Sequence, residues 1–302
     1  MSGSVSRSTQ HGIRASIRRG YASFTGRHTI GRALIYLLLG VYALGAILAF
    51  LWVLLVSLKS NPEFIGSSPW SLPKDWLFSN YVNAFTIADI GAFFLNSVLV
   101  TAAATALSVA VSCLAAYVIA RIPFGWNQII LQGFLIGLMV PPILIFIPLY
   151  TLLNQVNLLN TRTGLVLVYA TANMPFNIFV LSGFMKTLPT ELEEAAAMDG
   201  ATPFETFLRI LLPLCTPGIV SVAVLNILNN WNEFFYALAF LTDASRYTLP
   251  LGLYTLSQMA EYSSAWVTLF AGLIITAVPM LLIFALLQDR ITEGLTAGAL
   301  KG

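Results

Sequence analysis

The chain has 302 residues, of which 58% are hydrophobic and only 9% are charged, and its formal net charge is +2. Soluble domains carry about a quarter charged residues, so this composition excludes a soluble protein and predicts an integral membrane protein. A membrane-spanning helix needs roughly 20 apolar residues, and uncharged stretches of that length divide the chain.

The chain begins with a basic tail, residues 1–32, which carries six arginines and no acidic residue. Basic residues beside a span are retained in the cytoplasm, so the tail predicts a cytoplasmic N-terminus. Contact with anionic lipid explains its charge better than a nucleic-acid-binding arm does. The apolar run that follows, residues 33–58, is too long for a cleavable signal and lacks a small-residue cleavage site, so we expect a first span.

Five further apolar stretches follow, and each is predicted to be a helix because lipid offers no partner to an unpaired backbone group. Eleven of the fifteen lysines and arginines then fall on the inner side and four on the outer side, which places both termini in the cytoplasm. The prediction is a transmembrane domain over 33–288 and a cytoplasmic tail over 289–302, with spans at about 33–58, 93–119, 129–153, 163–185, 217–241 and 263–288.

The sequence also predicts a break in one span, two loops on the outer side and the role of the two cysteines. Pro141, Pro142 and Pro148 should break the third span, because proline cannot donate the helical backbone hydrogen bond. On the outer side, residues 59–90 are predicted to form an ordered surface loop, and residues 242–261 a shorter loop. Two cysteines, Cys113 and Cys215, fall in or at the inner edge of spans and are expected to be packing residues.

The longest inner connection, residues 186–216, starts with a helix signal. Thr190 and Glu193 have the capping-box spacing, in which each side chain pairs with the other's backbone N–H. Gly200 suits the left-handed residue that ends a helix. We therefore predict a short helix over 191–199 followed by a glycine turn.

A second helix should begin at Thr202, because Glu205 stands three residues later in the same capping pattern, and Pro213 and Pro217 should stop or kink it. Five acids make this connection acidic, unlike the other inner segments. It is either a partner-binding surface or a solvated hairpin packed on the membrane helices, and the residues alone leave both open. The acids are Glu191, Glu193, Glu194, Asp199 and Glu205, and in the second case the packed residues are Leu192, Ala195, Ala196 and Met198.

A resemblance to a known family favours the partner-binding surface over the solvated hairpin, and it rests on the spacing of residues in this connection. The connection resembles the EAA loop of ABC importer permeases. The segments 231–235 and 294–302 look like those of maltose-type carbohydrate permeases, and the resemblance covers all six spans. The residues that carry the EAA pattern are Glu194, Ala195 and Ala196, Gly200 after three further residues, Ile210 after nine, and Leu212 with Pro213 after one.

The resemblance implies a type I ABC importer permease, an all-α multi-pass protein of the bacterial inner membrane that is not itself an enzyme. It implies a second permease, two copies of an ATPase that binds ATP and Mg, an extracytoplasmic solute-binding protein and a sugar substrate. The chain has no GxxxxGK phosphate loop, in keeping with a separate ATPase. The implied ATPase-docking residues are Glu194, Ala195, Ala196, Asp199, Gly200, Ile210, Leu212, Pro213, Leu300, Lys301 and Gly302.

A solute path is predicted around Glu233, the only acidic residue inside a predicted span. A charged group in a membrane is costly unless it faces an interior or water. Amide and aromatic groups near it suit sugar hydroxyls and ring faces, although such groups also commonly hydrogen-bond between helices, and both roles stay open. The candidates are Asn173, Asn230, Trp231, Asn232, Glu233 and Tyr236.

Other transport classes fit less well. An ABC permease for another solute, such as a polyol phosphate, carries the same motifs. An ion-coupled secondary carrier would need more buried carboxylates or histidines than this chain offers, since His11 and His28 both lie in the tail. A membrane anchor that recruits a regulator through its acidic hairpin is the alternative outside transport.

Overall fold

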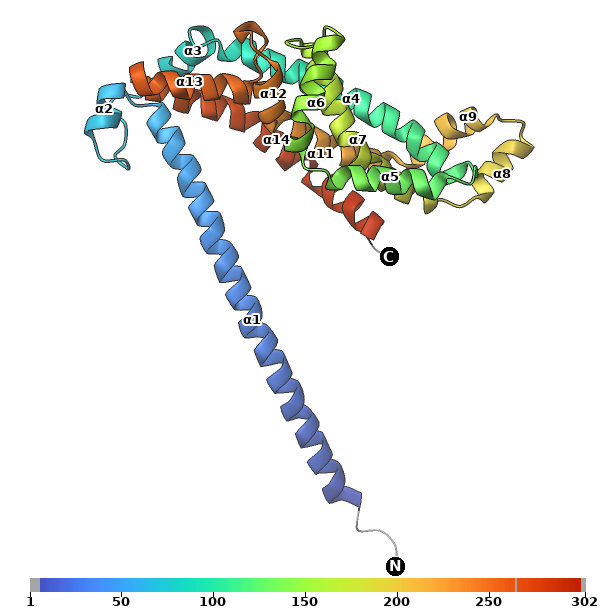
Figure 1. Cartoon of the computed structure of the whole chain (residues 1–302). Coiled ribbons are helices and arrows are strands. Elements are labelled where there is room, and N and C mark those ends of the chain that lie inside the picture. The colour runs from blue at the N-terminus through green and yellow to red at the C-terminus, as the bar shows by residue number, and fades with distance from the viewer. Residues whose placement is uncertain (1–5, 264, 300–302) are drawn as a thin grey trace, which may run out of the picture.

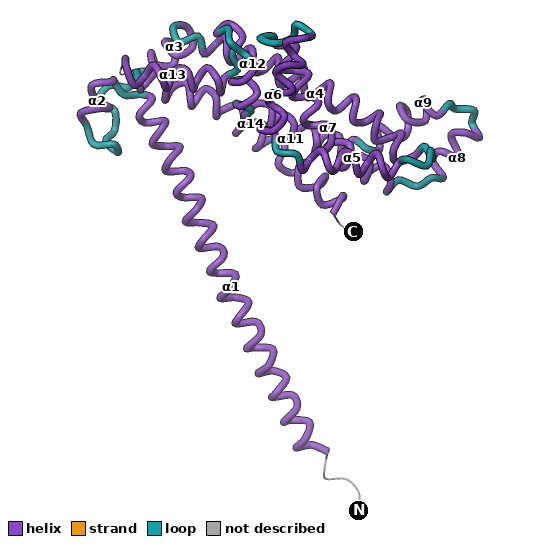
Figure 2. Tube along the Cα trace, in the orientation of Figure 1, coloured by secondary structure: helices purple, strands orange, loops and turns teal. Residues whose placement is uncertain are grey.

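The computed structural model describes residues 6–263 and 265–299, with side chains over 31–261 and 265–286. Every element in this described part is a helix (Figures 1 and 2). The long helices are α1 (Ser6–Ser57), α4 (Ile90–Arg121), α5 (Asn127–Met139), α6 (Pro142–Gln155), α7 (Arg162–Lys186), α11 (Thr216–Asn232), α13 (Leu249–Ser263) and α14 (Trp266–Ala299). The short ones are α2 (Asn61–Gly66), α3 (Ser79–Thr86), α8 (Glu191–Met198), α9 (Pro203–Thr206), η1 (Phe207–Leu211), α10 (Leu212–Leu214), α12 (Phe235–Phe240) and η2 (Ala244–Arg246).

The helix α1 stands apart from the remaining helices and meets them only near its C-terminal end (Figure 1). There the indole ring of Trp52 lies edge-on to Phe270, with ring centroids 5.4 Å apart, and its Nε1 donates to Pro69 O at 3.0 Å. Residues 31–49 are exposed along the helix. The backbone of α1 also continues through the predicted tail, so the helix is longer than the predicted first span.

The remaining helices form a bundle in which α4 packs on α7 and α11, and α11 packs on α14. Four helices in the described part are long and apolar enough to cross a membrane: the Gly31–Ser57 part of α1, α4, α7, and the Trp266–Leu286 part of α14. Two bent helix pairs bring the total to six if each pair is one span.

The third and fifth predicted spans are not single helices. Within 129–153, α5 and α6 meet at 102°, because Pro141 is extended ahead of Pro142 (φ −61°, ψ 128°), as the residue before a proline prefers. Within 217–241, α11 ends at Asn232 and α12 starts at Phe235, since Glu233 leaves the helical conformation (φ −68°, ψ 128°).

The segment 59–90 is ordered, as predicted, but it contains the helices α2 and α3. The Nζ of Lys59 is buried and donates to Ser71 Oγ at 2.9 Å, while Asn80 Nδ2 donates to the carbonyls of Ser57 and Lys59 at 2.8 Å each. The prediction of a loop over 242–261 was wrong beyond residue 248, because α13 occupies Leu249–Ser263 and packs on α4 and α14.

Candidate functional site

The hairpin of residues 187–215, which the charge bias predicts to lie on the inner side, projects at the end of the bundle away from α2 and α3 (Figure 1). Gly200 forms its turn with a φ of +83°, as predicted. The second capping box is present, because Glu205 N donates to Thr202 Oγ1 at 3.3 Å and Thr202 N donates to Glu205 Oε2 at 2.9 Å. These hydrogen bonds, backbone first, hold the pKa of the exposed Glu205 carboxyl below its usual range.

The first predicted capping box is wrong. Thr190 precedes α8, but its backbone is helical (φ −70°, ψ −25°) and its side chain makes no capping hydrogen bond. A capping side chain needs an extended backbone at that position. Glu193, its predicted partner, instead pairs with Arg121 at 3.4 Å.

The inner end of α4 holds both legs of the hairpin. The guanidinium of Arg121, whose side chain is only 6% exposed, donates to Leu188 O at 2.7 Å and pairs with Glu193 at 3.4 Å. One turn earlier, Tyr117 Oη donates to Pro203 O at 3.0 Å. The hairpin is therefore tied to a membrane helix by hydrogen bonds on each side of its turn.

An apolar cluster beneath the hairpin completes this attachment. Phe207 and Leu211 of the hairpin are buried against Met185 at the end of α7 and against Cys113 on α4. Cys215 belongs to the same cluster, and both cysteines are free and buried, as expected for packing residues. Close-packed side chains transmit displacement, so the hairpin and the inner ends of α4, α7 and α11 should move together.

The outward face of the hairpin is exposed and mixed in character. Met198 is 88% exposed. If the hairpin only packed on its own bundle, Met198 would be buried, so its exposure favours a partner-binding surface. Of the residues assigned to docking, Ala196 is buried and Ile210 and Leu212 are half-buried, so these three support the hairpin from inside. Glu194, Ala195, Asp199, Gly200 and Pro213 are exposed, and Leu300, Lys301 and Gly302 lie outside the described residues.

Exposed apolar side chains near the turn were missed by the sequence analysis. Phe204 and Leu208 are exposed and border, with α4, an apolar cavity, although an amphipathic pattern would bury some of these side chains. Only the fold reveals which apolar side chains face outward here.

In the bundle, the predicted path residues fall into a polar seam between α7 and α11. Tyr169 Oη donates to Glu233 Oε2 at 2.5 Å, and Asn173 Nδ2 donates to Asn230 Oδ1 at 2.8 Å. Asn230 Nδ2 in turn donates to Thr105 Oγ1 on α4 at 3.2 Å. The structure therefore brings Asn173, Asn230 and Glu233 together as interhelical partners.

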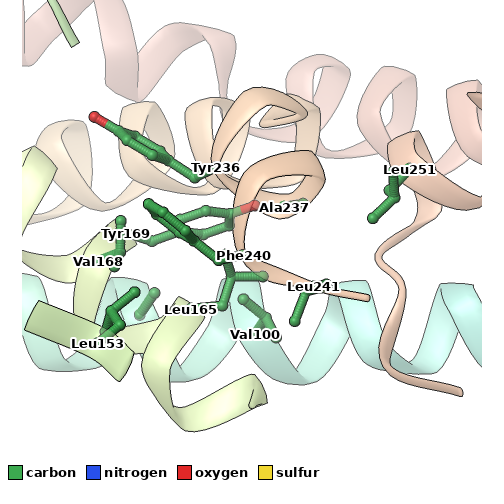
Figure 3. Close-up of a cluster of buried hydrophobic side chains, with 11 residues drawn as sticks. Val100, Leu153, Leu165, Val168, Tyr169, Tyr236, Ala237, Phe240, Leu241 and Leu251 are labelled. Atoms are coloured by element: carbon green, nitrogen blue, oxygen red, sulfur yellow. The ribbon is translucent and has the colours of Figure 1, made fainter. Parts of the chain in front are cut away.

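Glu233 also caps the start of α12 at the break between α11 and α12. Its carboxylate accepts the backbone N–H of Tyr236 at 2.8 Å and of Ala237 at 3.2 Å. Those amides open α12 and have no partner within the helix, which explains how a carboxylate is stabilised in an apolar span. Tyr236 and Tyr169 pack with Phe240 in a buried cluster next to this break (Figure 3).

Two further path candidates, Trp231 and Asn232, differ in whether the side chain is buried or exposed. Trp231 is buried and its Nε1 donates to Thr276 O at 3.3 Å on α14. Asn232 is exposed and its Nδ2 donates to Leu228 O at 2.8 Å, one turn back in the same helix. Among the predicted path residues with an amide side chain, Asn232 is therefore the exposed one.

Two cavities lie at the bend between α5 and α6 and share Pro142 and Tyr236. One, of about 450 Å³, extends along α7 past Thr171 and Pro175, and the other, of about 340 Å³, is bordered by Glu233 and Phe235. A larger apolar cavity of about 520 Å³ lies between α4 and the hairpin. The bend that breaks the third span therefore opens space directly beside the predicted path.

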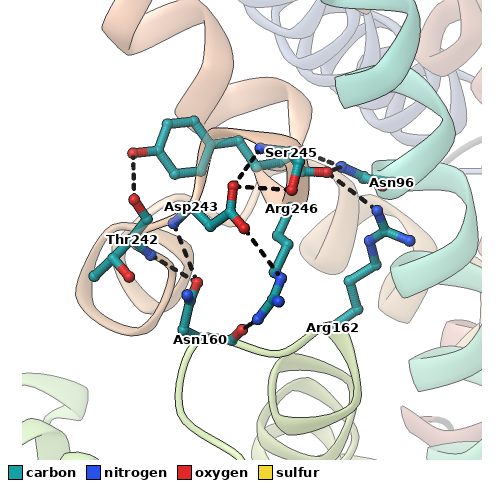
Figure 4. A network of polar contacts seen from close by, with 8 residues as sticks. Asn96, Asn160, Arg162, Thr242, Asp243, Ser245 and Arg246 are labelled. Atoms are coloured by element: carbon teal, nitrogen blue, oxygen red, sulfur yellow. Dashed lines mark hydrogen bonds and ion pairs between the residues drawn. The ribbon is translucent and has the colours of Figure 1, made fainter.

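A polar network joins α4 and the start of α7 to the segment between α12 and α13 (Figure 4). Asn160 Oδ1 accepts the backbone N–H groups of Thr242 and Asp243 at 3.0 and 3.1 Å. Arg162 and Asn96 both donate to Ser245 O, at 3.1 and 3.0 Å. Hydrogen bonds from the side chain and then the backbone of Ser245 lower the pKa of Asp243.

Known proteins match this chain closely. Residues 109–296 match the family described as "Binding-protein-dependent transport system inner membrane component". The diacetylchitobiose uptake system permease protein NgcG of Streptomyces coelicolor is 38% identical over 269 residues, which is 89% of each chain. The trehalose transport system permease protein SugB of Mycobacterium tuberculosis is 31% identical, covering 85% of this chain and 93% of its own.

A sulfonated-sugar relative and a solved structure extend the comparison. The sulfoquinovosyl glycerol transport system permease protein SmoH of Agrobacterium fabrum is 31% identical over 90% of this chain and 95% of its own. A crystal structure of a bacterial ABC transporter involved in the import of alginate shares the fold with a TM-score of 0.76. It is 20% identical in sequence and covers 86% of this chain and 96% of its own.

Proposed function

Because this chain belongs to the binding-protein-dependent transport system inner membrane component family, we propose that it forms part of the path by which a sugar or oligosaccharide enters the cell. The chain is a multi-pass, non-catalytic permease subunit of the inner membrane. The observation that carries the proposal is identity of 30% or more, over at least 85% of this chain, to permeases named for diacetylchitobiose, trehalose and sulfoquinovosyl glycerol.

A separate ATPase, present in two copies and binding ATP and Mg, would supply the energy by docking on the inner hairpin. The exposed face around Glu194 and Asp199 offers acidic side chains, and Met198 offers an apolar anchor. Exposed apolar residues rimmed by charge are typical of protein-binding sites. The tail residues Leu300, Lys301 and Gly302 are proposed to contact the same ATPase.

Two further partners follow from the family and from the surface. A second permease would cover part of the apolar surface of α5 and α6, where Met139, Ile143 and Ile147 are exposed. An extracytoplasmic binding protein would deliver the solute to the polar network of Figure 4, which is partly exposed around Asp243 and Arg246. Membrane lipid covers the remaining apolar surface.

The solute would pass beside Tyr236 and Glu233, which border the two cavities at the α5–α6 bend. Tyr236 and Phe235 provide aromatic rings that suit the apolar faces of sugar rings. Asn232 provides an exposed amide one turn away. Asn173, Asn230 and Trp231 are proposed to hold the helices that line this path.

Reconstitution in proteoliposomes tests the proposal. The chain, the second permease and the ATPase are assembled, and the uptake of labelled diacetylchitobiose and trehalose is measured with the binding protein present. We expect uptake that requires ATP and stops when the catalytic glutamate of the ATPase is changed. Uptake that proceeds without ATP along an ion gradient would instead identify a secondary carrier.

A further inference from the structure

The polar seam between α7 and α11 has the form of a ladder with regular spacing. Tyr169 bonds to Glu233 and Asn173 bonds to Asn230, so residue numbers rise along one helix as they fall along the other. The two helices are therefore antiparallel, and one helical turn separates successive pairs. Extending this register by four residues toward the hairpin would place Asn177 opposite Asn226.

No hydrogen bond joins Asn177 and Asn226 in the structure, so we call them the open pair. Asn177 is 0% exposed and Asn226 is 1% exposed, so neither amide reaches solvent. Asn177 Oδ1 has no hydrogen-bond partner, and neither does Asn226 Nδ2. One is an acceptor and the other a donor, so the two unpaired atoms are chemically complementary.

Unpaired polar atoms inside a membrane bundle are costly, because neither water nor lipid compensates them. The other amide group of Asn177 is engaged, since its Nδ2 donates to Ser108 Oγ on α4 at 2.9 Å. Nearer the hairpin, the buried hydroxyls of Ser112 on α4 and Ser182 on α7 also lack partners. The inner half of the seam is thus less satisfied than the rungs at Asn173 and Tyr169.

The open pair lies closest to the hairpin, which joins the inner ends of these two helices and of no others. The chain leaves α7 at Lys186 and enters α11 at Thr216. Phe207 and Leu211 of the hairpin share an apolar cluster with Leu181 and Val222, each four residues beyond the open pair toward the hairpin. Displacement of the hairpin must therefore reach Asn177 and Asn226 before it reaches the bonded rungs.

We propose that Asn177 and Asn226 are a positioning pair for transport, which hydrogen-bond to each other in one access state and separate in the other. The outer rungs, Asn173 with Asn230 and Tyr169 with Glu233, stay closed in both states and serve as the pivot. This inference rests on the proposed function, because the two states are those set by the ATPase on the hairpin.

Cross-linking in the assembled importer tests the pair directly. Asn177→Cys with Asn226→Cys is compared with the control Asn173→Cys and Asn230→Cys, after Cys113 and Cys215 are replaced by alanine. A short bifunctional thiol reagent is applied to the nucleotide-free and the vanadate-trapped complex. We expect the yield of the inner pair to differ at least threefold between the states and that of the control pair to stay constant.

Equal yields for the inner pair in both states overturn the inference. If the importer that carries the cysteine pair still takes up the sugar identified in the proteoliposome experiment, the proposed function stands and only the pair is disproved. If the ATPase does not assemble with the permease at all, both the proposed function and the pair are disproved.

A second measurement needs no introduced cysteines and no replacement of Cys113 and Cys215. Asn177→Leu and Asn226→Leu, which nearly preserve volume, are compared singly and together for ATPase activity and uptake. Each single change should lower the number of sugars imported per ATP several-fold, with the KM for sugar unchanged. The double variant should be no worse than the worse single one, whereas losses that multiply overturn the pair.

Discussion

At the scale of single residues, backbone conformation governs the hairpin turn. Gly200 has a φ of +83° and no atom within 4 Å of an added Cβ, so a side chain there meets backbone strain and not a clash. The sequence pattern predicted this residue because the glycine follows a helix directly. Arg121 could not be predicted in the same way, since its partners lie 67 and more residues away in the chain.

Gly200→Val should weaken the coupling of ATP hydrolysis to transport. A non-glycine residue in the left-handed region costs about 1–2 kcal/mol, and a β-branched residue tolerates it worst, so the turn should shift. We expect reduced co-purification of the ATPase and a large loss of uptake. Gly200→Asn, which accepts this conformation better, should lose less.

Gly183→Ala is the matched control, because Gly183 lies within α7 and an added Cβ there also meets no atom within 4 Å. It adds a methyl group without backbone strain, so uptake should stay near the original level. Normal transport by Gly200→Val would show that the turn angle is not needed for coupling.

Glu233→Ala should lower the thermal stability of the purified protein. The change leaves the amides of Tyr236 and Ala237 without an acceptor, and an unpaired buried donor costs about 1–3 kcal/mol. Tyr169→Phe removes only the hydroxyl partner and should cost less. A melting temperature for Glu233→Ala equal to that of the original chain would refute the capping role.

Glu233→Gln separates capping from a role in the solute path. Glutamine retains one oxygen that can accept the same amides, so the fold should persist. If the carboxylate also contacts the sugar, the KM for uptake should rise while the melting temperature changes little. Unchanged KM would assign Glu233 to structure alone.

At the scale of helices, features set by neighbouring residues were mostly predicted from the sequence, whereas features set by distant contacts were not. The starts of α8 and α9 were both predicted from neighbouring residues, but only α9 has the predicted capping box. Glu193, the expected partner of Thr190, pairs instead with Arg121, which is distant in the chain. The break at Pro141 and Pro142 was predicted from local sterics. The break after α11 was missed, because it depends on a carboxylate accepting amides within the same span.

Thr202→Ala should destabilise the second helix of the hairpin by about 1 kcal/mol, the usual value of a lost N-terminal cap. Hydrogen exchange over residues 203–211 should become faster. Thr190→Ala is the control at the other helix start, where the side chain makes no capping hydrogen bond and exchange should not change. Equal effects of the two changes would contradict the observed caps.

The same cap should depend on pH in a defined direction. Because the folded pKa of Glu205 is lowered, its contribution to stability is present above the unfolded pKa of about 4.3 and is lost as the pH falls through the folded value. Thr202→Ala removes the side-chain hydrogen bond from Thr202 Oγ1 to the Glu205 carboxylate, one of the causes of the lowered pKa, and keeps the backbone hydrogen bond, which is the larger cause. Titration of Glu205 by NMR should then move toward the unfolded pKa.

Arg121→Ala should detach the hairpin from α4. It leaves Leu188 O and the Glu193 carboxylate without their cation, at a cost of about 1–3 kcal/mol. Hydrogen exchange over residues 187–199 and loss of coupled uptake would report this. Arg209→Ala is the control, because Arg209 is 79% exposed and its pair with Glu205 should contribute about 0–1 kcal/mol.

At the scale of the whole molecule, composition predicted helices in a membrane, and the arrangement of those helices needed the structure. Hydropathy marks where a chain can cross lipid, but it carries no information on which helices touch. The detachment of α1 and the central place of α4 arise from packing between segments far apart in the chain. The polar seam likewise joins residues up to 125 positions apart.

The orientation of the whole chain is the last prediction. Eleven of the fifteen lysines and arginines lie in segments expected inside, so the hairpin should face the cytoplasm and the 59–90 segment the outside. Asp75→Cys and Asp199→Cys place single reactive thiols at exposed positions on these two sides. Cys113 and Cys215 are buried and should not be reached by a membrane-impermeant reagent in the folded protein.

Labelling with a membrane-impermeant maleimide distinguishes the two orientations. In sealed right-side-out vesicles Asp75→Cys should react and Asp199→Cys should not, and in inside-out vesicles the pattern should reverse. The opposite result would place the hairpin outside, where no cytoplasmic ATPase could reach Glu194 and Met198. The energy source proposed for transport therefore depends on this orientation, which the charge bias predicts independently of the family resemblance.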